Sequence, residues 1–476
     1  MKNNITDMTT GSPAKHILLF ALPMLIGNLF QQVYNLADSI IVGNFVGPDA
    51  FGAIGATSSI TFLFFALCNG VGNGGGIVTS QFFGAHDDES VKKCIINTGL
   101  IMLVVPMIIG ALAFVLSPSL LRLLDTPPEF MADATLYVRF MCCGLLFVSL
   151  YNYLSSVLRA LGDSKSPLYF LIFSTIVNVV LDILFVCVIP MGVAGAALAT
   201  LMAQFISVIT CAVYATRRNP YFRFKKSDFA IDRNMIRKVV RLGVPMSMQF
   251  SLIAISSMAL QRVVNSFGSS VATAFTTTNR IEQLIHQPYM TLGASLSTFC
   301  GQNYGAKRTD RVYEGYKTGT IILLVLSCIL IVVMQFFGRS IASLFLDADE
   351  SPYIITLATI GLQITSMFYM ALGMIYVIRG VLTGIGDAMF QLINGIVEVI
   401  GRFTFPILLT TYMDCDAAGI WISSGVVWCL SAYTAYLRYR SYFVRKNQIV
   451  IDAAGKKTKF YETFFTKSST VKPSSL

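Results

Sequence analysis

Residues 99–116 have the sequence GLIMLVVPMIIGALAFVL, a run without a single charged side chain. A helix of about 20 apolar residues crosses the hydrocarbon core of a bilayer. The run therefore predicts a transmembrane helix, which we place at residues 92–117. Similar apolar runs recur along the whole chain, separated by turn residues such as Gly162-Asp163.

These runs predict an all-α, polytopic membrane protein with 12 transmembrane helices. The predicted segments are 16–42, 50–76, 92–117, 133–160, 166–190, 192–216, 239–265, 271–299, 313–337, 353–380, 388–411 and 416–441.

The composition excludes a water-soluble fold. Of the 476 residues, 55% are hydrophobic and only 13% are charged, whereas soluble domains carry about 25% charged residues. The 10 Cys and 3 His residues show neither a disulfide framework nor the spacing of a metal site. The glycine cluster at 70–76 is not followed by the Lys of a phosphate-binding loop, and we interpret it as close helix packing or a flexible helix end. We therefore expect no enzyme, no cofactor and no direct use of ATP.

Lys and Arg are distributed unevenly between the two sides of the predicted protein. With the N-terminus in the cytoplasm, most of the 35 fall in the N-terminal tail, in the connections after even-numbered helices, and after residue 441. Arg379 is counted with the connection after the tenth helix, and the densest run is 217–241. Because such an excess marks cytoplasmic loops, both termini are predicted to be cytoplasmic in a multi-pass protein of the inner or plasma membrane. The charge of +10 then faces lipid headgroups, and we expect no nucleic acid as a partner.

The two halves of the chain resemble each other. Pro23-Met24 matches Pro245-Met246, Gln81–Ala85 matches Gln302–Ala306, and Gly162-Asp163 matches Gly386-Asp387, at offsets of 222, 221 and 224 residues. An even number of spans in each half makes these parallel repeats, which in transporters rock against each other around a site between them. We therefore predict two six-helix lobes related by pseudo-two-fold symmetry. Their limits are 1–216 and 239–441, with a basic cytoplasmic linker at 217–238 and a cytoplasmic tail at 442–476.

Polar side chains inside the first predicted lobe form the sharpest candidate site. Tyr34 and Asp38 are four residues apart on one helix, Asn178 and Asp182 are four apart on another, and Thr200 lies on the next. Buried ionisable residues in membranes are candidates for function. The repulsion between two nearby carboxylates is removed when one of them binds a proton or when a cation binds between them. Oxygen ligands suit a hard cation such as Na⁺. The alternatives are an interfacial role for Asp38 and a helix-packing hydrogen bond for Asn178 and Asp182.

The second half carries a different set of ionisable residues. Glu398 and Arg402 are four residues apart, and we favour a structural ion pair between them over a role in substrate binding. Glu282 is a candidate for the wall of a central cavity.

The sequence resembles the multidrug and toxic compound extrusion (MATE) transporters over about residues 12–440. The resemblance rests on Pro23, on the run from Gln31 to Gly43, on Gln81–Ala85, on Arg159–Asp163 and on Asn178–Asp182. It implies twelve helices in two lobes and export of small molecules coupled to entry of Na⁺ or H⁺. It also implies coupling roles for Tyr34, Asp38, Asn178, Asp182 and Thr200.

The chain departs from the branch of the family that carries a glutamate in helix 7, because residues 246–260 are uncharged. This departure favours coupling through the first lobe. We expect a monomer that exports amphipathic, often cationic compounds. The alternatives are a flippase for lipid-linked saccharides, which would favour a more cationic cavity, and, further off, a membrane-embedded enzyme.

Overall fold

The apolar run of residues 99–116 lies within one long helix, α3 (Asp88–Leu123), in the computed structural model of the chain. In hydrocarbon every backbone polar group needs an internal partner, and a continuous helix provides one. The structure describes the backbone of 4–45, 48–123, 126–346, 352–413, 415–445, 450–451 and 457–458. Within these ranges, the side chains of 33–45, 48–56, 58–59, 227, 254–255, 258–259 and from 443 onward are not described.

Helices form at all twelve predicted segments. The first half holds α1 (Pro13–Phe45), α2 (Pro48–Gly84), α3, η1 (Pro128–Phe130), α4 (Met131–Ala160), α5 (Lys165–Asp182), η2 (Ile183–Val188) and α6 (Gly192–Arg218). The connection holds η3 (Pro220–Phe222) and η4 (Lys226–Phe229). The second half holds α7 (Arg233–Ser266), α8 (Ser269–Gly305), α9 (Thr309–Ser343), α10 (Pro352–Ser366), α11 (Tyr369–Gly384), α12 (Met389–Ile407), η5 (Leu408–Tyr412) and α13 (Ala418–Arg445). Two short strands follow, β1 (Val450–Ile451) and β2 (Lys457–Thr458), which pair antiparallel.

One span of the fold, α8, is more polar than most of the others. Among the described residues, nine helices are long and apolar enough to cross a membrane, and ten if α10 and α11 form one bent span. The other two spans of the twelve are α7 and α8. Helix α8 packs against α1, α2, α9, α10 and α11, so much of its surface faces other helices instead of lipid. A helix in that position tolerates polar residues.

The tenth predicted span, 353–380, consists of two helices, α10 and α11. It bends by 50° between α10 and α11. Gln335 of α9 donates its side-chain N–H to the carbonyl of Gln363, at 2.8 Å. The amide of Met367, which would bond that carbonyl in a regular helix, bonds Ile364 instead. A side chain that enters the helical hydrogen-bond ladder is a known cause of kinks.

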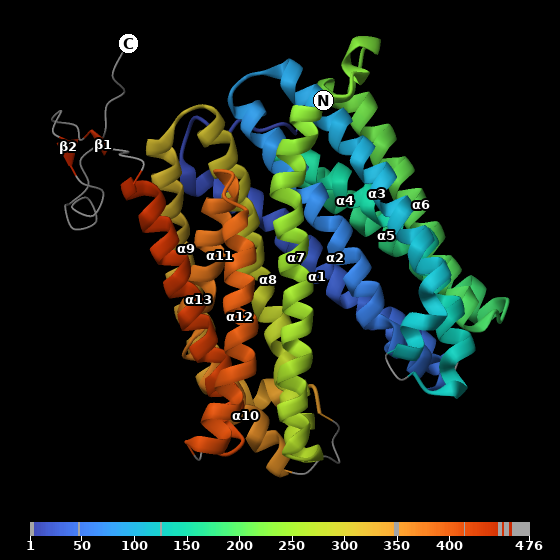
Figure 1. Cartoon of the computed structure of the whole chain (residues 1–476). Coiled ribbons are helices and arrows are strands. Elements are labelled where there is room, and N and C mark those ends of the chain that lie inside the picture. Colours follow the sequence, from blue (N-terminus) through green and yellow to red (C-terminus); the bar gives the residue numbers. More distant parts are fainter. Residues whose placement is uncertain are drawn as a thin grey trace.

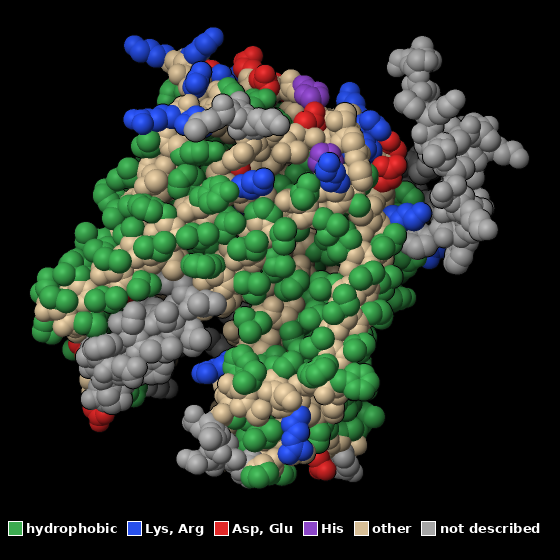
Figure 2. Space-filling model, turned by 180° about the vertical axis from the view of Figure 1, so that it is seen from behind, with side chains coloured by type: hydrophobic (Ala, Val, Ile, Leu, Met, Phe, Trp, Pro, Cys, Tyr) green, Lys and Arg blue, Asp and Glu red, His purple; other side chains and the backbone are tan. Residues whose placement is uncertain are grey.

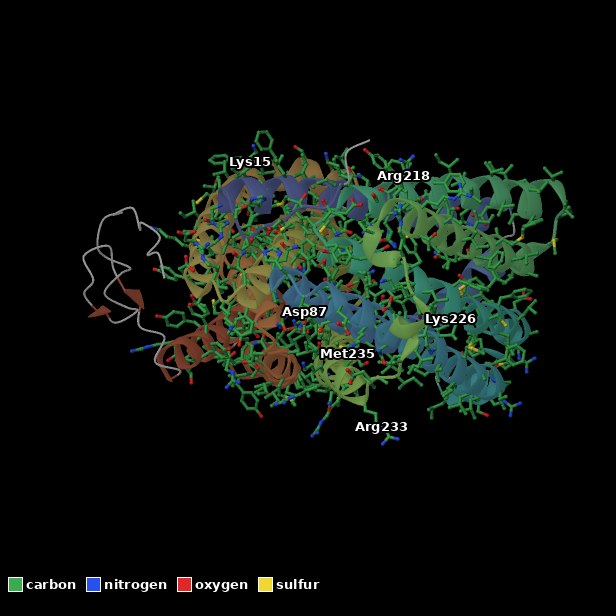
Figure 3. The ribbon with its side chains drawn as sticks, turned by 90° about the horizontal axis from the view of Figure 1, so that it is seen from above. Lys15, Asp87, Arg218, Lys226, Arg233 and Met235 are labelled. Carbon is green, nitrogen blue, oxygen red and sulfur yellow. The ribbon has the colours of Figure 1, made fainter. Side chains whose placement is uncertain are left out.

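The helices form two arms that meet at one end of the molecule and diverge toward the other (Figure 1). We call the helices α1 to α6 the first arm and the helices α7 to α13 the second arm. Lys and Arg side chains gather at the end where the arms meet, and hydrophobic side chains cover the flanks (Figure 2). Viewed onto that end, Lys15 at the start of α1 lies over one side, whereas Arg218 and Lys226 lie over the other (Figure 3).

The first helix of each half packs against the second helix of the other half. Helix α1 contacts α8, and α7 contacts α2. Glycines of the cluster at 70–76 make the second contact possible: a Cβ on Gly70 would lie 2.2 Å from Ser247 Oγ, and one on Gly74 would lie 2.7 Å from the Gly243 nitrogen. This supports close packing as the role of the cluster, which lies inside α2 and does not end it.

Candidate functional site

Asn178 and Asp182 lie on one face of α5, one helical turn apart. Their side chains are 3% and 0% exposed. Helix α5 packs against α1 and α6, so this polar face is enclosed by apolar helices of the first arm. The structure thus gives two of the predicted site residues a buried position without solvent.

Asp182 is also the last residue of the regular helix. The six residues that follow form a π-helical turn, η2, and the amide of Ile189 closes it on the carbonyl of Leu184 at 2.8 Å. Such turns often occur at functional sites. The second arm has a similar turn, η5, at the end of α12. The widened turn therefore belongs to the repeat, whereas the carboxylate before it belongs only to the first half.

The other predicted members of this site lie on the neighbouring helices. Thr200 is half-buried on α6. Tyr34 and Asp38 lie on α1, but their side chains are outside the described residues. The backbone of α1 approaches α5 closely at Gly27, where a Cβ would lie 3.3 Å from a methyl of Leu168. The three predicted helices are therefore brought together, and the side-chain geometry is described for Asn178, Asp182 and Thr200.

The amide group of Asn178 carries an unmet hydrogen-bonding capacity. Neither its oxygen nor its nitrogen has a hydrogen-bond partner among the described residues, although both atoms are buried. A buried polar group without a partner is destabilising, and such groups in native proteins call for an explanation. An amide and a carboxylate one helical turn apart supply oxygen atoms of the type that hard cations prefer. Proton binding at Asp182 suits the same position.

In the second arm, the prediction for Glu398 is wrong in its partner. The Glu398 carboxylate pairs with Arg379 of α11 and not with Arg402. Arg379 also donates to Asn394 Oδ1 at 2.7 Å, and Asn394 donates to the carbonyl of Ser431 at 3.1 Å. The i, i+4 spacing suggested a partner on the same helix, but α11 packs close enough to α12 to supply a better one. This network is buried and paired within itself.

Arg379 itself was misplaced by the charge distribution, which assigned it to a cytoplasmic connection. It is only 9% exposed inside α11. The sequence signal that could have identified Arg379 as buried is its position inside the apolar run 353–380.

Arg402 and Glu282 lie in another polar region of the same arm. Arg402 donates to Ser257 Oγ at 3.2 Å, and Thr365 and Arg402 are polar neighbours of Glu282. His286, one turn after Glu282, lies edge-on to Trp428 with ring centres 5.8 Å apart and has Tyr376 as a further neighbour. The sequence gave no reason to join His286 to Glu282 beyond their spacing on one helix. Whether Glu282 lines a central cavity stays a prediction.

Comparisons with known proteins agree with this architecture. The sequence model of the MatE family matches residues 23–184 and 245–405, one block in each half. The probable multidrug resistance protein YpnP of Bacillus subtilis is 30% identical over 439 residues, with 91% of this chain and 96% of the relative covered. The multidrug export protein MepA of Staphylococcus haemolyticus is 23% identical, with 92% and 95% covered.

Among solved structures, one described as a crystal structure of MATE in complex with MaL6 superposes with a TM-score of 0.88. It is 24% identical and covers 94% of this chain and 100% of its own. At that identity the likeness concerns the fold.

Proposed function

This chain belongs to the MATE family of multidrug efflux transporters, and we propose that it exports amphipathic, often cationic compounds in exchange for entering Na⁺ or H⁺. As a transporter it needs a substrate path and a coupling site, not a catalytic centre. The plasma membrane of the cell is the proposed location, with both termini in the cytoplasm, and we propose that the monomer is the working unit.

The observation that carries the coupling proposal is the buried pair Asn178 and Asp182. The amide lacks a partner among the described residues, while the carboxylate ends the regular part of α5. A buried amide with unmet hydrogen-bonding capacity, one turn from a buried carboxylate, suits a site that takes up and releases an ion in each cycle. Tyr34, Asp38 and Thr200 are proposed to complete it.

We propose that the moving bodies are lobes 1–216 and 239–441, joined by the linker 217–238. In the structure the arms meet at the Lys- and Arg-rich end (Figure 2). With that end in the cytoplasm, the conformation corresponds to a cavity open to the outside. Export then requires the arms to separate at the basic end and to close at the other.

The rival function, a flippase for lipid-linked saccharides, receives less support. Such a substrate carries phosphate and would favour a cationic cavity. The buried Arg379 is instead neutralised by Glu398. Transport of amphipathic cations requires no such excess of positive charge.

The experiment is coupled efflux from proteoliposomes. A Na⁺ gradient and a pH gradient are imposed separately, and efflux of a fluorescent organic cation is followed. One of the two gradients is expected to drive efflux. If neither accelerates efflux over protein-free vesicles, the proposal fails.

Variants then test the site. Asp182→Asn and Asp38→Asn each preserve size and remove an ionisable group, and coupled efflux is expected to fall by about tenfold or more. The double variant should be little worse than either single one, because groups that act as a unit are not additive. Asp310→Asn, which weakens a half-exposed pair with Arg308, is the matched control and should transport normally. Normal coupled efflux by both single variants would return Asn178 and Asp182 to a packing role.

A further inference from the structure

Two glutamines join the halves of the molecule at the basic end. Gln81, near the end of α2, donates its side-chain N–H to the carbonyl of Gly384 at 2.8 Å. Gln302, near the end of α8, donates in the same way to the carbonyl of Ala160 at 3.0 Å. Gly384 ends α11 and Ala160 ends α4, so each glutamine closes the C-terminus of a helix in the opposite half.

These two bonds are copies of one another. Gln81 and Gln302 are equivalent in the sequence repeat, and so are Ala160 and Gly384. The backbones beneath them touch reciprocally: a Cβ on Gly84 would lie 1.8 Å from the Gln302 carbonyl oxygen, and one on Gly305 would lie 1.8 Å from that of Gln81. Separation of the arms at this end must break both bonds together.

The symmetry is broken by the N-terminal strap, which we define as residues 4–9. The amide of Met8 donates to Gln302 Oε1 at 2.9 Å. Its carbonyl accepts from Asn303 at 3.2 Å and from Arg311 at 3.1 Å. The Met8 side chain is 1% exposed. Both ends of the Gln302 amide are therefore occupied, one by the opposite half and the other by the strap.

The strap is also attached to the first half. The amide of Thr6 donates to the Leu161 carbonyl at 3.3 Å, and Asn4 donates to Ser166 Oγ at 3.4 Å. Gly162 leaves room for it, since a Cβ there would lie 2.2 Å from the Thr6 carbonyl oxygen. Within five residues, the strap thus bonds the turn after α4 and the start of α5 in one half, and the end of α8 and the start of α9 in the other.

We propose that the N-terminal strap is a lock on the basic end. It keeps the hydrogen bonds of Gln81 and Gln302 between the halves intact, and Met8 must detach from its partners on α8 and α9 before the arms separate there. The proposal rests on the proposed transport cycle. The bond of Thr6 to the first half is opposed, two residues away in the chain, by the bonds of Met8 to the second half. Relative movement of the halves therefore strains the strap directly. Its release favours the conformation that is open at the basic end.

The pseudo-symmetric glutamines provide a matched pair of variants. Gln81→Ala removes one bridge and leaves the Met8 site untouched, whereas Gln302→Ala removes its counterpart together with a partner of the strap. Hydrogen–deuterium exchange is measured on the full-length protein in lipid nanodiscs, in peptides covering 4–12, 80–86 and 300–308. Gln302→Ala is expected to accelerate exchange in all three, by about fivefold for each hydrogen bond lost. Gln81→Ala is expected to leave 4–12 protected.

Removal of the strap is the decisive test. A variant lacking residues 2–9 should show faster exchange at 80–86 and 300–308 and a higher fraction open at the basic end. Thr6→Pro, which removes the amide bond to Leu161 and fixes the backbone φ at that position, is a smaller change and should shift exchange in the same direction. Unchanged exchange at 80–86 and 300–308 in both variants would overturn the lock.

Exchange also separates this proposal from that of the transport cycle, because it needs no substrate. Faster exchange without any coupled efflux from the wild-type protein would contradict the proposed function alone. Wild-type efflux together with unchanged exchange in the strap variants would contradict the lock alone.

Discussion

Asn178 on α5 and Arg402 on α12 occupy equivalent positions in the two halves, as do Asp182 and Pro406. Both helices end in a π-helical turn, so the backbone of the repeat is preserved where its chemistry has diverged. The first arm buries an amide without a partner among the described residues. The second buries a carboxylate that is paired with Arg379 and supported by Asn394. At these two places the first arm therefore leaves a buried hydrogen-bonding capacity unused, whereas the second arm closes it in the network around Glu398.

The largest difference between the two arms is expected in the stability effect of a substitution at Glu398. Glu398→Ala leaves Arg379 as an uncompensated buried charge, which should lower the free energy of unfolding by about 3–5 kcal/mol. The measurement is unfolding of the purified protein in detergent. The double variant Arg379→Met/Glu398→Leu, which removes both charges, should be within about 1 kcal/mol of the wild type. A single variant as stable as the wild type would show that the network does not stabilise the second arm.

The two buried asparagines should respond in opposite directions. Asn394→Leu breaks bonds with Arg379 and Ser431 and should destabilise by about 1–3 kcal/mol. Asn178→Leu removes an unsatisfied amide and should stabilise by about 1 kcal/mol, while coupled efflux falls. Unfolding and proteoliposome efflux are measured on the same preparations. Equal destabilisation by both variants would erase the contrast between the arms.

The turns that follow α4 and α11 offer a second matched pair. Gly162 and Gly386 have φ angles of +82° and +92°, so alanine at either position costs about 1–2 kcal/mol of strain. At Gly162 the added Cβ would also lie 2.2 Å from the Thr6 carbonyl oxygen, whereas at Gly386 the nearest atom is Gln81 Nε2 at 3.4 Å. Gly162→Ala is therefore expected to be the more destabilising variant in thermal unfolding. The reverse order would mean that the strap does not pack against this turn.

The smallest effects concern the aspartates of the same turns. Asp163 accepts bonds from the amides of Lys165 and Ser166 and so caps the start of α5. Asp387 instead accepts from Arg438 of α13 at 2.7 Å. That pair is half-exposed on the Arg438 side, so Asp387→Asn should cost about 0–1 kcal/mol.

Burial raises the pKa of Asp163 above its ordinary value of 3.8, although bonds from Ser166 and Lys165 oppose the shift. The folded protein then keeps a proton that the unfolded chain has lost. Stability from this group is complete below pH 3.8 and is lost as the pH rises through the folded pKa. Asp163→Asn should flatten that slope in unfolding curves recorded across mildly acidic pH. A slope unchanged by the substitution would assign the dependence to other groups.

Local patterns in the sequence were sufficient to locate the helices. They were not sufficient to predict which side chains on different helices contact each other. The apolar runs located all twelve spans, because the length of a span is set by the bilayer. The bend at Met367 was missed because its cause is Gln335, a side chain on a different helix. The partner of Glu398 was missed for the same reason. Spacing along one helix identifies neighbours on that helix, but contacts between helices depend on packing that a single sequence does not display.

The candidate site shows the same division. Its residues were chosen because they are polar or charged within apolar runs and because pairs of them are four residues apart. The structure shows that Asn178 and Asp182 are buried. The π-helical turn after Asp182 has no signature in the residues 183–188, which are uniformly apolar. The lock at the basic end involves Met8, Gln81 and Gln302, ordinary residues whose role depends on segments distant in the chain.

The docking of Met8 also has a consequence for synthesis on the ribosome. Asn303, which holds its carbonyl, is made 295 residues after Met8. At about 5–20 residues per second, the strap waits roughly 15 to 60 s for its binding site to be translated. During that interval the first helices are already in the membrane while the segment before them has no second half to bind. The beginning of the chain is thus among the last parts to reach its native position, and nascent chains arrested before α8 should expose it to an added protease.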